Sequence, residues 1–252
     1  MRIKRYFIFE FSVLKYFVAG ILLCLLCLFL PERGSGFGGG TVATAGEMQS
    51  IVRSRMEKMR ELGITEADKE LEEVILAEWT DYLTESVDLT EEMNQIDSII
   101  YYCIGSGEYD DETWEWTPSS EQVYMFDMEV FNVGSMYTDF LHGIMPLMGE
   151  EVRITDIEED LSGVDEESGM GTQILRFRCN GNPYEFQAEA HYDWMDMNVM
   201  DFMNGVLRQE NAGKQLWAAF DGGQGIIVFY NTEDWAKQYK KKMGYKLMSS
   251  AE

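Results

Sequence analysis

Residues 191–207, HYDWMDMNVMDFMNGVL, bring four methionines and three aspartates together with a histidine and a tryptophan. Convergent thioethers could bind a soft metal ion, and two facing carboxylates could act as an acid–base pair. At about 100° per residue, however, the methionines of a helix here would spread over more than half of its circumference. Val199, Phe202 and Val206 share one apolar stripe. The spacing therefore predicts an amphipathic helix whose methionines fill gaps in the core.

The start of this segment holds the residues best suited to binding or reaction. His191 ends a predicted strand on the same polar face as Glu189, and a Glu–His pair could act as a general base or as half of a metal site. We expect Asp193 to cap the helix, next to Trp194. The other histidine, His142, is expected near a helix end. A hydrolase that uses His191 and nearby acids is one possible function.

Two acidic loops, at 107–112 and 155–171, carry enough carboxylates to suggest calcium. Calcium needs six to eight oxygen ligands, commonly from a tight loop with alternating ligands and a central glycine. Neither loop has that pattern, and no nucleophile motif is present. We therefore expect solvated acidic loops and assign no catalytic, metal-binding or cofactor-binding residue.

Two tryptophans, Trp114 and Trp116, lie in the polar segment 105–116, which reads as an exposed loop. Aromatic side chains on an accessible loop are effective anchors in protein interfaces. The residues that we predict to contact a protein partner are Trp114, Trp116, His191, Asp193 and Trp194.

Residues 1–30 carry the clearest targeting signal. Basic residues precede an apolar run that extends over 11–30 if the long Lys15 side chain reaches the membrane interface. A helix needs about 20 apolar residues to span a bilayer, so this run predicts a retained membrane anchor. The preceding basic residues predict a single-pass protein of the cell membrane with a cytoplasmic N-terminus and an extracytoplasmic body. Cleavage near Ala45 would instead give a secreted protein.

The chain has a formal net charge of −25, and its bases are enriched before residue 46. The acidic body repels nucleic-acid phosphates and anionic lipids, so a nucleic-acid partner is not expected. A basic protein or a cation is a more natural partner, although the charge also favours solubility. Five lysines between 237 and 246 either stabilise a helix C-terminus or form a docking face for the helical half or for anionic lipid.

The pattern beyond the anchor predicts a Gly-rich tether at 31–46 and a helical domain at 47–148. Helices are expected at 47–62, at 65–87 with Thr65 as its cap, at 91–104, at 118–131 and at 135–142. Gly143 and Pro146 are expected to close this region.

From 149 to 252 the pattern predicts an α+β domain of order β-β-β-α-β-β-α. Two hairpins are expected, one turning at 180–182 and one at 221–225, followed by a helix that Thr232 caps and Gly244 ends. In the first hairpin Tyr184, Phe186, Ala188, Ala190 and Tyr192 are expected on one face. Helices should cover one face of a single antiparallel sheet. Cys103 and Cys179 are either bridged or buried separately.

These features predict a non-enzymatic, membrane-anchored acidic module that engages a protein partner outside the cytoplasm. The first alternative is an inhibitor or immunity-type protein that neutralises a basic enzyme, and the second is the hydrolase that uses His191.

Overall fold

The computed structural model describes residues 44–249 except 87–92, 111, 114, 131 and 222. They belong to one compact unit, Thr41–Glu252. The predicted anchor and nearly all of the predicted tether lie outside the described residues. None of the helices in the described ranges combines the length and apolar character that crossing a membrane requires.

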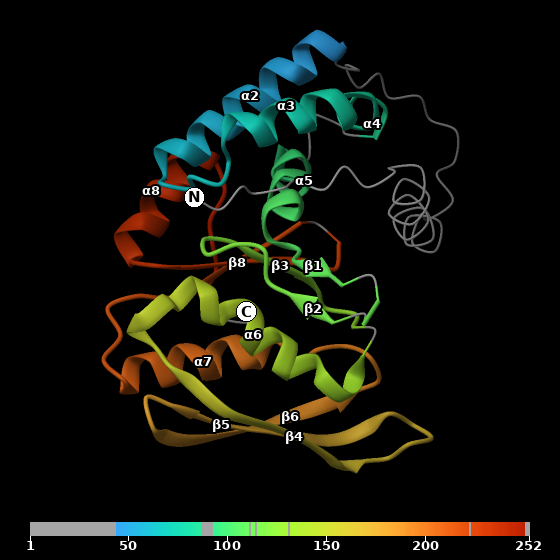
Figure 1. The fold of residues 1–252 in the computed structure, drawn as a ribbon, viewed down its shortest axis with the longest axis vertical. Helices are drawn as coiled ribbons and strands as arrows, with labels where there is room; N and C mark the ends of the chain where they lie inside the picture. The colour runs from blue at the N-terminus through green and yellow to red at the C-terminus, as the bar shows by residue number, and fades with distance from the viewer. Residues whose placement is uncertain are drawn as a thin grey trace. The chain divides into compact units, whose positions relative to one another are not determined.

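One layer of the unit consists of helices (Figure 1). It contains α2 (Ala45–Glu61), α3 (Lys69–Glu78), α4 (Thr80–Ser86), α5 (Met93–Gly105) and α8 (Glu233–Met243). Thr44 and Glu47 form a capping box that begins α2. Asp68 caps α3, so the prediction that Thr65 does so is wrong; the Thr65 hydroxyl contacts Gln122 instead. The single helix expected at 65–87 is divided into α3 and α4 at Trp79.

The strands of the described residues form three antiparallel sheets, which confirms the α+β class. A small pair joins β1 (Glu108–Tyr109) to β2 (Trp116–Thr117). The middle sheet has the order β3-β8-β7, with β3 at Tyr124–Asp127, β7 at Gln215–Phe220 and β8 at Gly225–Asn231. The outer sheet has the order β4-β5-β6, with β4 at Ile154–Val164, β5 at Met170–Cys179 and β6 at Asn182–His191.

Two sequence predictions about these sheets are wrong. Segment 118–131 was expected to be helical, but it contains β3, which pairs with β8. The five strands after residue 149 were expected in one sheet, but they divide between the middle and outer sheets. The expected order of elements along the chain after residue 149 is nevertheless observed.

The middle sheet is buried on both faces, contrary to the expected one-sided cover. Leu216, Ile226 and Val228 face one hydrophobic cluster, whereas Trp217, Ile227 and Phe229 face the other. The apolar runs LWAAF and IIVFY therefore reflect a sheet with helices on each side. The first cluster contains the outer sheet, and the second contains the helical layer. The domain limits at 148 and 149 stay a prediction.

Two helices, α6 (Met136–Met148) and α7 (Asn198–Gln209), lie between the middle and outer sheets (Figure 1). A 3-10 turn precedes α6 at Val133–Ser135 and another follows it at Gly149–Glu151. Contrary to expectation, α6 continues through Gly143 and Pro146, which places His142 inside the helix and exposed. Gly143 is required there, because a Cβ atom would lie under 3.0 Å from the Tyr124 ring.

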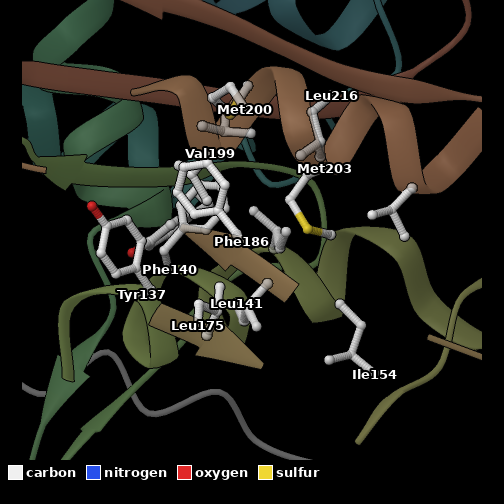
Figure 2. Packing of buried hydrophobic residues seen from close by; sticks show 14 of the residues in the cluster. Tyr137, Phe140, Leu141, Ile154, Leu175, Phe186, Val199, Met200, Met203 and Leu216 are labelled. Carbon is white, nitrogen blue, oxygen red and sulfur yellow. The ribbon is translucent and has the colours of Figure 1, made fainter. Parts of the chain in front are cut away.

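The methionines of α7 take the role that the helical pattern predicts. Met200 and Met203 are buried in the first cluster, where Figure 2 shows them packed with Val199, Phe186 and Leu216. The Asn204 side chain bonds to both backbone groups of Leu216 at 2.8 and 3.0 Å, which fastens α7 to β7.

A buried polar network joins three helices of the helical layer. Arg55 of α2 forms a bidentate ion pair with Asp97 of α5 and donates to the carbonyl of Met243 at the end of α8. The Tyr245 hydroxyl donates to Asp97 at 2.9 Å and also contacts the Tyr239 hydroxyl. Arg55 and Asp97 are 3% and 0% exposed, so this ion pair is shielded from water.

Lys242 pairs with Glu61, so one of the C-terminal lysines contacts the helical half.

Candidate binding surface

The end of β6 brings three of the predicted contact residues together. His191 and Trp194 form an isolated antiparallel bridge, and the Trp194 amide donates to the His191 carbonyl at 3.1 Å. Tyr192 lies between them, with its ring edge-on to the His191 ring at 5.7 Å. Asp193 completes this tight reversal of the chain.

The reversal is attached to β3 as well as to β6. Trp194 bridges to Glu129, just beyond β3. The Val130 amide donates to the Asp193 carbonyl at 2.7 Å, and the Met195 amide donates to the Met128 carbonyl at 2.9 Å. Segment 191–195 therefore joins the outer sheet to the middle sheet through backbone hydrogen bonds. Such attachment holds exposed side chains in a defined arrangement before any partner binds.

Tyr192 has an unusual backbone conformation. Its φ is 57°, in the left-handed region that non-glycine residues with bulky side chains seldom adopt. The Tyr192 amide donates to the Gly169 carbonyl at 2.9 Å, and Gly169 must be glycine because a Cβ atom would lie 2.9 Å from the Tyr192 ring. Tyr192 was expected on the buried face of β6, but it is 56% exposed. The positive φ removes it from the alternation of the strand.

Next to Tyr192, the neighbouring strand adds a further apolar side chain. Met170 begins β5 and is paired with His191, so both lie on the outer face of the sheet. Met170 and Trp194 are each 37% exposed. Most large apolar side chains of the described residues are buried, so this is a local concentration of exposed apolar area at one end of the outer sheet.

Acidic side chains surround these apolar residues. Glu189 shares the outer face with His191, Glu129 is bridged to Trp194, and Asp165 lies in the turn that leads to Met170. Within the described part of the chain, none of these acids, nor Asp193, forms an ion pair. We call the combined set the acidic aromatic surface: Met170, His191, Tyr192 and Trp194, with Glu129, Asp165, Glu189 and Asp193.

Asp193 does not cap a helix, which corrects the sequence prediction. Helix α7 begins at Asn198, and Asp196 accepts a hydrogen bond from the Asn198 amide at 3.0 Å. The same carboxylate accepts from the Glu189 amide at 3.0 Å, so it fastens α7 to the edge of β6. Asp193 is thereby left with a half-buried side chain at the acidic aromatic surface.

Of the two predicted loop tryptophans, Trp114 lies outside the described residues. Trp116 is half-buried in β2, where its Nε1 donates to the Ser106 carbonyl at 2.9 Å and its ring packs 5.7 Å from that of Tyr124. This corrects the expectation of an exposed side chain. Trp116 also lies near the start of β3, whereas Trp194 lies beyond its end, so the fold does not join them in one patch. Its role in partner binding stays a prediction.

The candidates for metal or catalytic chemistry are not assembled into a site. In the described part of the chain, no hydrogen bond or ion pair connects His191 to an acid, and no three His, Cys, Asp or Glu residues are placed to hold a metal. The acids of 155–171 have other contacts: Asp156 pairs with Arg178, and Asp160 with Arg176. The Asp165 carboxylate accepts from Ser168.

The cysteines of the body are both free and occupy different cores. Cys179 is buried in the first cluster, and Cys103 packs against the second. Burial raises the pKa of Cys103 to about 12 and that of Cys179 to about 11, so neither is a ready nucleophile.

Sequence reasoning identified His191, Asp193 and Trp194 as candidates but missed Met170 and assigned Tyr192 to the core. The available signal was the Gly169-Met170-Gly171 turn, because glycines on both sides of an apolar residue are typical of a sharply turned strand end. Its pairing with His191 depends on the register of β5 against β6. No family model, curated protein or solved structure matches this chain, so the geometry of this surface carries the functional argument.

Proposed function

We propose that this chain is a membrane-anchored acidic module whose body lies outside the cytoplasm and binds a protein partner without catalysing a reaction. The observation that carries the proposal is the acidic aromatic surface. It presents Tyr192 and Trp194 to solvent on a segment that is bonded to two sheets. Exposed aromatic side chains on a rigid frame are the usual anchors of protein interfaces.

The conformation of Tyr192 supports a binding role. A left-handed conformation costs about 1–2 kcal/mol for a residue with a Cβ atom. An exposed ring recovers little of that cost through burial in the free protein. Strain of this kind is concentrated at functional sites, where it holds a side chain in the geometry that a ligand needs.

The membrane location rests on the basic and apolar pattern of residues 1–30. A reporter enzyme that is active only in the cytoplasm, fused after Glu252, tests it. We expect no reporter activity in intact cells. Strong activity would overturn the proposed topology and leave the surface to be tested separately.

Crosslinking of the full-length protein in its native membrane, followed by purification, tests the binding role. We expect one reproducible partner, recovered equally by the wild type and by Tyr102→Ala, and lost by Tyr192→Ala combined with Trp194→Ala. Tyr102 is the matched control because, like Trp194, it is 37% exposed, but it lies on α5 in the helical layer. Recovery of no reproducible partner would contradict the binding role. Equal recovery by all variants would contradict the assignment of the surface.

A second candidate function is inhibition of a basic enzyme, which the excess of unpaired acids at the surface favours. Such an inhibitor should release its target as the salt concentration rises, because screening weakens attraction between exposed charges. Inhibition of the recovered partner's own activity would distinguish it from a simple binding module.

A further inference from the structure

We propose that the acidic aromatic surface binds a segment of its partner that is rich in arginine or lysine. This inference rests on the proposed function and adds the chemistry of the partner. Its three supporting observations are the distribution of charge, the position of the aromatic rings and the rigidity of the frame.

The surface is built from stretches of chain that contain no lysine or arginine. No lysine or arginine occurs between Lys69 and Arg153, between Arg153 and Arg176, or between Arg178 and Arg208. Segments 127–130, 165–170 and 189–194, which form the surface, come from these three stretches in turn. The acids of the surface therefore have no lysine or arginine close to them along the chain, and His191 is the one other basic side chain in these segments.

Within the described residues, no lysine or arginine forms an ion pair with an acid of the surface. On the strands of the outer sheet, the lysine or arginine nearest to Glu189 is Arg176, which lies four residues along β5 from Thr172, the partner of Glu189, a separation of about 13 Å at roughly 3.3 Å per residue. Arg176 already pairs with Asp160 and Glu185. About 13 Å exceeds the screening length of about 8 Å at physiological ionic strength, so this guanidinium compensates the charge of Glu189 only weakly.

The aromatic rings favour partner side chains that carry a guanidinium or ammonium group. Exposed tyrosine and tryptophan rings attract guanidinium and ammonium groups through their negative faces, and arginine stacks on them most often. Trp194 is bridged to Glu129 and lies next to Asp193, so a bound guanidinium could contact a ring and a carboxylate together. Met170 supplies an apolar contact for the aliphatic part of such a side chain.

The same charge distribution argues against other ligands. Nucleic acids and anionic lipids carry the same sign as the surface and would be repelled. A divalent ion would need several converging oxygens, and among the described residues no such group exists. The partner that fits is therefore a basic protein segment.

Fluorescence anisotropy on the purified full-length protein tests the proposal. The probes are labelled peptides of equal length in which glycine alternates with arginine, lysine or glutamate. We expect the arginine and lysine peptides to bind and the glutamate peptide not to bind. Raised salt should weaken the binding of both basic peptides. Failure of both basic peptides to bind at low salt would overturn the inference.

Matched variants separate this surface from the general acidity of the body. Glu129→Gln with Asp193→Asn removes two charges at the surface, and Glu70→Gln with Glu73→Gln removes two exposed charges on α3. We expect about tenfold weaker arginine-peptide binding for the first pair and less than about twofold for the second. Trp194→Ala should also weaken binding about tenfold, while Tyr102→Ala should not. Equal losses in the two charge pairs would show non-specific attraction and overturn the inference.

The two proposals fail in different ways. If crosslinking recovers a partner whose loss depends on Tyr192 and Trp194, but the basic peptides show no preference for this surface, the binding role stands and the inferred chemistry is wrong. If the peptides bind as expected but no partner is recovered from the membrane, the proposed function is wrong. Melting curves that match the wild type confirm that each variant is folded.

Discussion

Replacement of Asp97 by leucine should destabilise the body strongly, because it leaves a buried guanidinium without its counter-ion. Asp97 accepts two hydrogen bonds from Arg55 and one from the Tyr245 hydroxyl. Arg55 is 3% exposed, so water cannot replace the lost carboxylate. The only other bond of the Arg55 side chain within the described residues is to the Met243 carbonyl at 2.9 Å.

The magnitude follows from the behaviour of buried ion pairs. Removal of one partner of a buried pair typically costs about 3–5 kcal/mol, because the remaining charge stays desolvated. In a protein of this size each kcal/mol lowers Tm by about 2–4 °C, so we expect a fall of about 6–20 °C. Replacement of both members by apolar residues, Arg55→Met with Asp97→Leu, should restore most of the loss, because it removes the unpaired charge.

The assay is a thermal melt of the full-length protein in mild non-ionic detergent, followed by near-UV circular dichroism. The control is Lys237→Met, which removes an exposed lysine that pairs with Glu233 and Asp234. That variant should melt with the wild type, since exposed ion pairs contribute little. The reasoning is refuted if Asp97→Leu lowers Tm by less than about 2 °C, or if the double variant melts as low as the single one.

Three further predictions concern packing, reactivity and pH. Gly143→Ala should destabilise the body by about 1–3 kcal/mol, because its Cβ would overlap a buried tyrosine ring. Gly205→Ala in α7 should stabilise the body by up to about 1 kcal/mol, because a Cβ there would meet only the Arg208 side chain, at an ordinary contact distance of 3.8 Å. Paired thermal melts would show both signs. Cys103 and Cys179 should resist alkylation at pH 8 in the folded protein and react after denaturation, as peptide-level mass spectrometry would show; rapid labelling of either residue in the native state would contradict its burial. Burial raises the pKa of Asp221 above its ordinary value of 3.8, so the folded state holds this proton more tightly than the unfolded chain does. The contribution of Asp221 to stability is therefore fully present below pH 3.8 and is lost as the pH rises through the folded-state pKa. In thermal melts at stepped pH, Asp221→Asn should reduce the fall of Tm with rising pH. An unchanged dependence of Tm on pH would contradict the role assigned to Asp221.

The helices and strands that the sequence predicted most accurately are those whose burial follows a local period. The β6 strand alternates between exposed and buried residues from Glu185 to Ala190, as its sequence predicts. Thr232 and Gly244 begin and end α8 through contacts with nearby residues of the chain. Where the pairing partner is distant, local reasoning failed. The segment of β3 was expected to be helical, but its backbone pairs with β8, about a hundred residues later.

The candidate surface shows the same limit. Local sequence sufficed to select His191 and Trp194, because polar and aromatic residues cluster at a strand end. It could not show that Met170 lies beside them, which depends on the register between two strands. Nor could it show that Tyr192 leaves the core, since its left-handed conformation is set by the hydrogen bond to Gly169. Trp116 was misjudged because its cover comes from Tyr124 and the Ser106 carbonyl.

The amino-acid sequence by itself determined the α+β class, the acidic character, the order of elements after residue 149 and the apolar stripe of α7. These properties depend on composition or on contacts within a few residues, so they are present in the local pattern. Tertiary structure alone decided that the five strands after residue 149 divide between two sheets with α6 and α7 between them. It also decided which acids stay unpaired beside Trp194, because ion pairing and burial depend on residues that are far apart in the chain.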